Sequence, residues 1–219
     1  MNKLAYQLIV FDWEGTLSDT LGQVFELISD EANTRGLEPP DWNQLRDSIQ
    51  YGPNIALRKI FPNLSEEELF QFLNILQKKL AKSSEQAYLL PGAFEFIQLL
   101  HNLGFDLAVA SNKGEQSLVK SIKLAGLDPY IQVFRSSGQT APKPHPEMLE
   151  QILSIFQCPA ERCLMVGDSE TDVEMAQQLN VPAVGMDFYH QNQASLEKAG
   201  AVVVVDNFDD LAKFIGIKE

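Results

Sequence analysis

From residue 105 to residue 205 the sequence alternates short apolar runs with amphipathic stretches, and this alternation constrains the fold more than any other feature. The apolar runs predict strands at residues 105–110, 131–134, 163–166, 183–185 and 201–205. The amphipathic stretches predict helices at residues 115–125, 146–156 and 171–179. Strands that alternate with helices pair in parallel, with helices on both faces of the sheet. With a first strand at residues 8–11, the pattern predicts an α/β fold with a doubly wound, mainly parallel, Rossmann-like sheet.

Residues 17–87 follow a different pattern, which predicts an inserted all-helical domain. Helices are expected at residues 24–35, 43–49 and 66–82, and no convincing strand interrupts them. Ser65 precedes the last of these helices and Glu68 follows three residues later, which is a capping-box signature. Residues 88–92 predict a linker and turn. We therefore expect residues 1–16 and 88–219 to form the α/β core and residues 17–87 to form a separate helical domain.

The composition predicts a globular chain that does not bind polyanions through its overall charge. At 219 residues with 45% apolar content, the chain is long enough to bury a substantial core. It has 30 acidic and 17 basic residues, a formal net charge of -13. This charge disfavours nucleic acid and anionic membrane surfaces, so we expect neither as a partner. An anionic ligand must be bound by local groups, and a metal cation suits that purpose.

Neither the amino-terminal residues nor the cysteines indicate export. Residues 1–10 lack the long apolar region and the cleavage site of a signal peptide, and no segment approaches the ~20 apolar residues of a membrane span. Cys158 and Cys163 are not spaced as C-x-x-C, and we interpret them as buried or half-buried thiols. Because thiols stay reduced in the cytoplasm, we expect a cytoplasmic protein. No obvious metal-ligand set is completed by the three histidines, His101, His145 and His190.

The first predicted strand ends in two acidic residues, Asp12 and Glu14. Side chains alternate along a strand, so both acids point to the same side while the extended geometry continues, and Gly15 allows a sharp turn. Two carboxylates in one cleft separate their pKa values, so one can stay ionised while the other donates a proton. An acidic turn after an ordinary strand explains the same residues when they are considered alone.

Polar residues also follow other predicted strands or precede a predicted helix. In open α/β sheets, ligands bind beyond the carboxyl ends of the strands. We therefore expect these residues to meet the two acids at one edge of the sheet. They are Ser111, Asn112, Lys113, Lys143, Asp168 and Asp172.

The residue types at this edge suit phosphoryl chemistry. Asp12 can attack phosphorus and form an aspartyl-phosphate, which divides hydrolysis into two transfers. Asp12, Asp168 and the backbone carbonyl of Glu14 are hard oxygen ligands of the kind that Mg²⁺ prefers. Three further side chains can bind phosphate oxygens near a helix start or offset the charge of the transferring group: Ser111, Asn112 and Lys143.

Each of these residues also has a structural interpretation. Ser111 and Asn112 can cap the helix that follows them. Lys143 can be a solvated loop residue, since the neighbouring prolines alone explain a rigid turn. Asp168 and Ser169 can form a helix N-cap, and Asp172 can be a first-turn acid favoured by the helix dipole. The presence of all these groups, in this order at strand ends, favours a common site.

Four motifs can be recognised in these residues: Asp12-x-Glu14-Gly15-Thr16, Ser111-Asn112, Lys143-Pro144 and Gly167-Asp168-Ser169-x-x-Asp172. They resemble the four motifs of the haloacid dehalogenase-like hydrolase superfamily, and the resemblance spans nearly the whole chain. Within the superfamily, the helical insert resembles the small helical cap. The segments Ser111-Asn112-Lys113 and Lys143-Pro144-His145-Pro146 are similar to those of phosphoglycolate phosphatase-like members. The resemblance implies a Mg²⁺-dependent phosphatase that acts on a small phosphorylated metabolite through an aspartyl-phosphate.

The resemblance also implies a role for each residue of the motifs. The catalytic residues would be Asp12, Glu14 and Lys143. The phosphate-binding residues would be Ser111, Asn112 and Lys143. The metal ligands would be Asp12, Glu14 and Asp168, with Thr16 and Asp172 in support.

Position 14 departs from the family pattern, because phosphatases of this superfamily ordinarily have Asp there. Glu14 keeps the carboxyl group but adds one methylene, which moves the proton by up to about 1.5 Å, one C–C bond length. General acid–base assistance is worth roughly 10² to 10⁴ in rate. We expect metal and phosphate binding to be preserved more fully than fast turnover.

Two other functions stay open at this point. The same nucleophile can cleave a phosphonate C–P bond if a lysine of the cap forms a Schiff base, and the candidates are Lys59, Lys78, Lys79 and Lys82. The chain can also be a phospholigand-binding protein with weakened acid–base function. Dehalogenases match less well because they lack an acid at position 14, and mutases because they depend on proton positioning there.

Substrate specificity is expected to come from the cap. The candidate residues are Trp42, Arg46, Tyr51 and Arg58, with residues 50–53 as a candidate specificity turn. An arginine can bind a substrate carboxylate in a bidentate manner, but the sequence favours solvated surface arginines at both positions, 46 and 58. For the oligomeric state, we expect a monomer or a homodimer.

Overall fold

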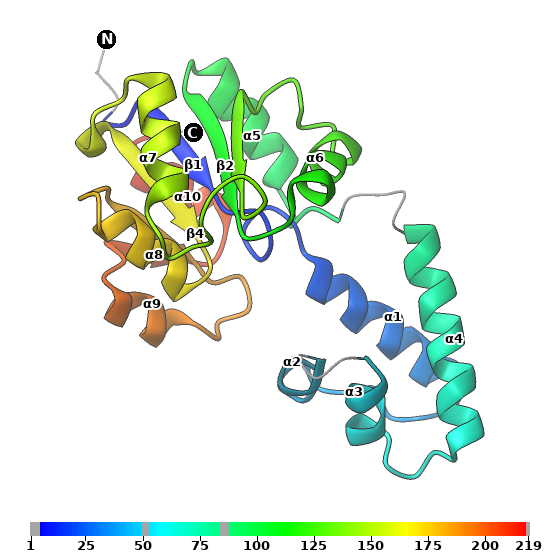
Figure 1. The fold of residues 1–219 in the computed structure, drawn as a ribbon. Coiled ribbons are helices and arrows are strands. Elements are labelled where there is room, and N and C mark those ends of the chain that lie inside the picture. Colours follow the sequence, from blue (N-terminus) through cyan, green and yellow to red (C-terminus); the bar gives the residue numbers. More distant parts are fainter. Residues whose placement is uncertain (1–4, 50–52, 84–87, 218–219) are drawn as a thin grey trace. The chain divides into compact units, whose positions relative to one another are not determined.

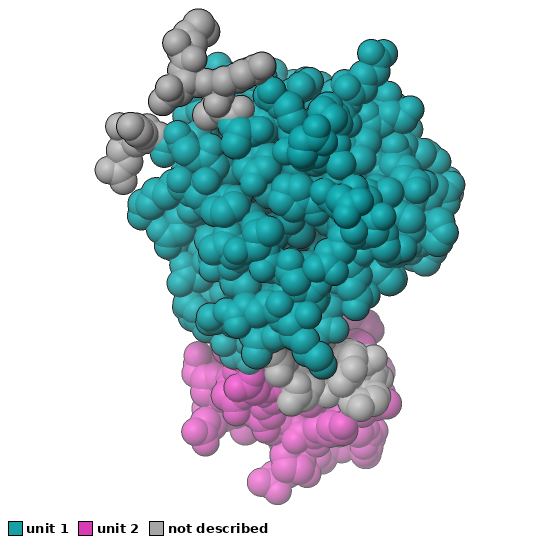
Figure 2. All heavy atoms as spheres, turned by 90° about the vertical axis from the view of Figure 1, so that its left-hand side faces the viewer, with its two compact units in different colours: residues 1–18, 89–219 teal, residues 19–88 magenta. Residues whose placement is uncertain are grey.

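The computed structural model describes residues 5–49, 53–83 and 88–217, and the chain divides into two compact units (Figures 1 and 2). The core unit comprises residues 1–18 and 89–219, and the helical unit comprises residues 19–88. These divisions lie close to the boundaries expected from the sequence, after residues 16 and 87. Each unit has its own buried cluster of apolar side chains and is described by itself.

The core unit is built on a six-stranded sheet with the order β3-β2-β1-β4-β5-β6. The strands are β1 (Leu8–Phe11), β2 (Asp106–Ser111), β3 (Val133–Ser136), β4 (Cys163–Gly167), β5 (Ala183–Met186) and β6 (Val203–Val205). Neighbouring strands pair in parallel, and Phe11 of β1 lies opposite Val109 of β2 and Val166 of β4. The predicted doubly wound α/β fold is confirmed.

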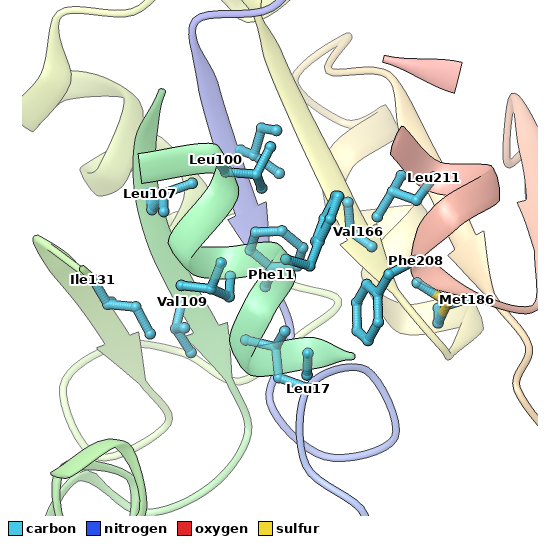
Figure 3. Close-up of a cluster of buried hydrophobic side chains, with 14 of the residues drawn as sticks. Phe11, Leu17, Leu100, Leu107, Val109, Ile131, Val166, Met186, Phe208 and Leu211 are labelled. Carbon is cyan, nitrogen blue, oxygen red and sulfur yellow. The ribbon is translucent and has the colours of Figure 1, made fainter. Parts of the chain in front are cut away.

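Helices cover both faces of this sheet because strand side chains alternate between them. Ile9 and Phe11 pack against α5 (Ala93–Asn102), α6 (Glu115–Leu124) and α10 (Phe208–Phe214). Leu8 and Val10 pack against the opposite layer, which contains α7 (Glu147–Phe156), α8 (Glu170–Gln177) and α9 (Gln193–Ala199). A short 3-10 helix, η1 (Ala160–Arg162), precedes β4. Figure 3 shows the first of these clusters, in which Phe11 and Phe208 point into the same interior.

The helical unit contains α1 (Thr20–Thr34), α2 (Trp42–Ile49), α3 (Pro53–Ile60) and α4 (Glu66–Ser83). Its described residues include no strand, as expected. The predicted capping box is confirmed at the start of α4: Ser65 N donates to Glu68 Oε2 at 2.8 Å, and Glu68 N donates to Ser65 Oγ at 3.3 Å. Apolar side chains from the four helices, such as Ile28, Leu57 and Phe72, form the interior of the unit.

A buried acid, Glu31, crosslinks two helices of this unit. Its carboxylate lies 2.9 Å from Arg35 Nε and 3.2 Å from Lys79 Nζ of α4, and the Arg35 guanidinium stacks 5.0 Å above the ring of Phe72. Burial acts to raise the pKa of Glu31, but the hydrogen bonds from Arg35 and Lys79 outweigh burial and hold the pKa below 4.5. Lys79, one of the four candidate Schiff-base lysines, therefore takes part in a structural ion pair.

Several elements differ from the sequence-based expectation. The sequence did not predict four helices: α3, α5, α9 and α10. Helices α9 and α10 have seven residues each, which is less than two helical turns. Such a short segment does not show a helical repeat of apolar residues. Strand β3 lies two residues further along than the predicted 131–134. As an edge strand it tolerates polar side chains, and Arg135 Nε donates to Gln151 Oε1 at 2.6 Å.

Two further expectations concern the thiols and the membrane. Cys158 and Cys163 are free and buried, as predicted. Burial raises the pKa of both thiols above the ordinary value, which makes them unreactive. Within the described ranges, no helix combines the length and the apolarity needed to cross a membrane.

Candidate active site

The carboxyl ends of β1, β2 and β4 form the floor of a pocket of about 420 Å³. These three strands are neighbours in the sheet, so the loops that follow them meet at one edge. Asp12 N donates to Val166 O at 2.9 Å, which extends the pairing of β1 with β4 to the first site residue. The pocket is lined by Asp12, Glu14, Ser111, Asn112, Lys113, Lys143, Asp168, Ser169 and Thr171. The structure thus brings together most of the residues that the sequence placed at strand ends.

A tight loop after β1 presents Asp12 and Glu14 to the pocket. Trp13 is fully buried and anchors the loop, its carbonyl accepting from Ser18 N at 2.8 Å. Gly15 has φ +79°, and its N–H donates to Ser18 O at 2.8 Å. Asp12 itself is buried, while the Glu14 side chain is 38% exposed. The two acids therefore occupy different environments.

Lys143 lies between two buried carboxylates. Its Nζ is 2.6 Å from Asp12 Oδ1 and 2.6 Å from Asp172 Oδ1, and its side chain is 3% exposed. Burial alone would lower the pKa of Lys143, but the two carboxylates outweigh burial and raise it above the ordinary value. Lys143 is therefore a fixed positive charge beside Asp12 and not a solvated loop residue.

Asp172 joins Lys143 to the start of α8. While Oδ1 faces Lys143, Asp172 Oδ2 accepts from Ser169 N at 3.1 Å and from Ser169 Oγ at 2.6 Å. Ser169 is the N-cap of α8, so the structural interpretation of this segment is confirmed. Gly167 permits this arrangement, because a Cβ on residue 167 would lie 2.3 Å from Asp172 Cγ.

The Ser111-Asn112 segment orients the loop of Lys143 instead of capping a helix. Asn112 Nδ2 donates to Lys143 O at 3.2 Å, and Lys143 N donates to Asn112 Oδ1 at 2.7 Å. The N-cap of α6 is Gly114, and neither Ser111 nor Asn112 caps that helix. The side-chain amide of Asn112 is thus already engaged by the backbone of Lys143. Ser111 is buried at the pocket floor, where its hydroxyl accepts from Lys113 N at 3.3 Å.

Two further residues of the first motif have distinct surroundings. Glu14 Oε1 accepts a hydrogen bond from Lys113 Nζ, and the two form an ion pair across the loops that follow β1 and β2. Thr16 is fully buried, and its hydroxyl has no partner among the described residues.

The carboxylates of the pocket fit a divalent cation. One oxygen each of Asp12, Asp168 and Asp172 lies within 4.8 Å of the others. Since Lys143 and Ser169 engage both oxygens of Asp172, Asp12 and Asp168 are the carboxylates best placed to hold a metal.

The pKa values of these two carboxylates are raised. Burial raises the pKa of Asp12 to about 6; the charge of Asp172 acts in the same direction, and Lys143 acts against it. Burial and the charge of Asp12 raise the pKa of Asp168 well above the ordinary value. A cation would relieve this repulsion, and hard carboxylate oxygens suit Mg²⁺.

Sequence reasoning missed a support for Asp168 that comes from the loop after β5. Asn192 Nδ2 donates to Asp168 O at 3.2 Å, and Asn192 N donates to Asp187 Oδ2 at 3.0 Å. Asp187 directly follows β5, whereas the predicted strand ended at residue 185. An acid directly after a strand is the signal that would have identified this loop. Lys113 was recognised at a strand end but was given no role.

The model of the family described as haloacid dehalogenase-like hydrolase matches residues 9–186, which contain all four motifs and the whole helical unit. The chain belongs to this family. The resemblance recognised in the motifs is thereby confirmed, and the protein is a hydrolase of the haloacid dehalogenase-like type.

Similar proteins include several phosphoglycolate phosphatases. The one from Rhodospirillum rubrum is 27% identical over 227 residues, covering 96% of this chain and 91% of its own. The one from Vibrio parahaemolyticus is 23% identical over 226 residues, covering 99% of each chain. Among solved structures, a HAD family hydrolase from Deinococcus radiodurans with bound phosphate and sodium aligns with TM-score 0.76 and 19% identity, covering 98% of each chain. At this identity the structural match supports the fold alone.

The specificity candidates of this hydrolase are only partly described. Trp42 packs edge-on against Phe25, with ring centroids 5.2 Å apart. Arg58 donates to Asn54 Oδ1 at 3.2 Å and pairs with Glu66 through both terminal nitrogens, so its guanidinium takes part in surface contacts of the helical unit. The side chain of Arg46, Tyr51 and residues 50–52 of the candidate turn lie outside the described residues.

Proposed function

We propose that this hydrolase is a Mg²⁺-dependent phosphatase that cleaves small organic phosphate monoesters through an aspartyl-phosphate, with phosphoglycolate-like compounds as first candidates. The observation that carries the proposal is the position of Asp12, a buried carboxylate in a pocket beside the Lys143 ammonium and the Asp168 carboxylate. The phosphoglycolate phosphatases among the relatives support the substrate class.

In the first half of the proposed reaction, Asp12 is the nucleophile. A carboxylate oxygen of Asp12 bonds to phosphorus while the bond from phosphorus to the leaving oxygen breaks. The leaving oxygen takes a proton from the carboxyl group of Glu14 and departs as an alcohol. The Lys143 ammonium stabilises the negative charge on the transferring group, and Ser111 at the pocket floor donates its hydroxyl to a phosphate oxygen.

In the second half, water hydrolyses the aspartyl-phosphate. Glu14, now a carboxylate, accepts a proton from the water as its oxygen bonds to phosphorus, and the bond from phosphorus to Asp12 breaks. Inorganic phosphate leaves, and both carboxyl groups return to their initial states. Asn112 contributes by holding the backbone of Lys143 in place through its paired hydrogen bonds.

Asp12 and Asp168 would hold Mg²⁺, together with the backbone carbonyl of Glu14. When bound, the ion supplies positive charge that offsets the phosphate and the two carboxylates. Asp172 and Thr16, both fully buried, would support this site without binding the ion themselves. Asp172 would do so by holding the Lys143 ammonium in place. Binding can be measured without turnover: Mg²⁺ titrated calorimetrically into wild type should give a saturable heat of binding, and Asp168→Asn should abolish most of it.

The helical unit, residues 19–88, would act as the specificity cap for the small phosphorylated metabolite. The net charge of -13 supports the expectation that nucleic acid and anionic membranes are not partners. The buried free thiols Cys158 and Cys163 are consistent with a reducing, cytoplasmic setting.

The decisive experiment is a phosphatase panel with Mg²⁺ on wild type and Asp12→Asn. Phosphoglycolate, sugar phosphates and nucleotides should be included, with inorganic phosphate release as the readout. Wild type should hydrolyse at least one small monoester, and Asp12→Asn should lose all activity. A wild type that binds phosphate and turns over none of these compounds would contradict the proposal and favour a phospholigand-binding role.

A further inference from the structure

We propose that Lys113 is a positioning residue for Glu14, and that it determines which oxygen of the Glu14 carboxyl group exchanges the proton. The inference rests on the proposed phosphatase function, because it concerns the acid–base residue of that reaction. It gives a physical reason for the longer side chain at position 14, where the resemblance leads to an expectation of Asp.

The sheet places the two residues face to face. Glu14 follows β1 and Lys113 follows β2, and these strands are adjacent and parallel with Phe11 opposite Val109. The backbone around Lys113 is held by hydrogen bonds on its amino-terminal side. Lys113 N donates to Ser111 Oγ at 3.3 Å, and Asn112 O accepts from Ser137 Oγ at 2.8 Å. The Lys113 ammonium is therefore presented to Glu14 from a braced loop.

The two lysines of the pocket have separate surroundings. Lys143 is 3% exposed and has two carboxylate partners, Asp12 and Asp172. Lys113 is 23% exposed and, among the described residues, pairs with Glu14 alone. Because Lys143 is already committed, Lys113 is the cation available to orient the acid–base residue.

The ion pair distinguishes the two oxygens of Glu14. An ammonium group only donates, so the oxygen that it contacts, Oε1, serves as an acceptor. Glu14 Oε2 has no hydrogen-bond partner in the described part of the chain, and Glu14 is one of the residues that line the pocket. The proton exchanged with the leaving oxygen, and later with water, is then carried on Oε2.

The extra methylene of Glu14 gives the carboxyl group a rotatable bond that Asp lacks. Without a partner, a half-exposed Glu side chain samples several rotamers, and only some of them place the carboxyl group correctly. The contact with Lys113 selects among these rotamers. Glu14 and Lys113 together would do what a shorter acid does alone.

A double-mutant cycle on kcat and KM tests this role, with the variants Lys113→Met, Glu14→Gln and the pair combined. Lys113→Met should lower kcat roughly 10-fold to 100-fold, as expected for a misplaced catalytic group, with KM changed less than about twofold. In the Glu14→Gln background, Lys113→Met should change kcat less than about twofold.

Two further variants serve as rescue and control. Lys113→Arg should keep most of the wild-type activity, and Lys120→Met, at an exposed lysine on α6, should match wild type. A rise in KM that persists in both backgrounds would overturn the inference, because it would mean that Lys113 binds substrate.

A second measurement needs no turnover and separates this inference from the proposed function. Lysine ammonium signals in ¹H–¹⁵N spectra identify Lys113 by their loss in Lys113→Met. Glu14→Gln should shift that signal, whereas Asp210→Asn, which removes the surface partner of Lys213, should leave it unchanged. An unshifted Lys113 signal overturns the positioning role whatever the activity. Failure of the phosphatase panel with a shifted signal rejects the proposed reaction and leaves the contact established.

Discussion

Gly15 lies so close to Asp168 that a Cβ on residue 15 would come within 2.2 Å of Asp168 Oδ2. The two residues belong to the loops after β1 and β4, which are neighbours in the sheet. The hydrogen atom at position 15 is thus the only substituent that leaves room for the Asp168 carboxylate. Gly15 is needed here for close approach as well as for its positive φ.

Substituting Gly15→Ala should therefore displace Asp168. We expect kcat/KM to fall more than roughly 10-fold and Mg²⁺ affinity to weaken, in addition to a backbone cost of about 1 kcal/mol. Gly104→Ala is the matched control, because Gly104 has φ +85° and nothing within 4 Å of its built Cβ. Calorimetric Mg²⁺ titration and steady-state kinetics on both variants measure the difference. Equal kinetics in the two variants would contradict the close-approach explanation.

Removing the buried ammonium of Lys143 should affect both stability and activity. Lys143→Met leaves Asp12 and Asp172 without their shared counter-ion, and breaking a buried pair in this way costs about 3–5 kcal/mol. We expect the free energy of unfolding in urea to fall by an amount of this order and phosphate release to become undetectable. Lys120→Met, on the exposed surface of α6, should match wild type. Wild-type turnover by Lys143→Met would exclude a role for this lysine.

The support that Asn192 gives Asp168 can be tested with two adjacent residues. Asn192→Ala removes the hydrogen bond to Asp168 O, which is worth about 1 kcal/mol, and should lower kcat/KM several-fold. Gln193→Ala is the control, since the exposed Gln193 side chain donates to Glu197 of α9 and has no other hydrogen-bond acceptor among the described residues. If both variants behave like wild type in steady-state assays, the β5 loop does not position Asp168.

The ion pairs of Glu31 predict a pH dependence of stability. The pKa of Glu31 is lower in the folded protein than its ordinary value of 4.5. A lowered acid pKa contributes stability above pH 4.5 that is lost as the pH falls through the folded-state value. Glu31→Gln should therefore melt at a lower temperature than wild type at neutral pH, and the difference should shrink below about pH 4.5. Thermal melts by circular dichroism measure this, with the exposed Glu26→Gln on α1 as control. A difference that stays constant with pH would assign the effect of Glu31 to packing.

The pattern of apolar runs in the sequence was sufficient to predict most strands of the sheet. Buried parallel strands are continuous apolar runs, so residues 8–11 and 163–166 were recognisable, and the turn residues after them marked the edge where the site lies. Helices α9 and α10 were missed because seven residues do not complete two turns of a helical period. The position of β3 depended on its place at the sheet edge, which no local pattern encodes.

The sequence by itself determined which chemical groups stand at the strand ends, because the order of motifs along the chain is enough to bring Asp12, Lys143 and Asp168 to one edge of a parallel sheet. Only the tertiary structure decided how those groups are paired. Lys143 is shared between Asp12 and Asp172, and Glu14 contacts Lys113 from a neighbouring loop. Such contacts join residues far apart in the chain, and they depend on strand order, register and the side-chain space left by glycines. Strand order, register and side-chain space are properties of the folded chain and cannot be read from a local sequence pattern.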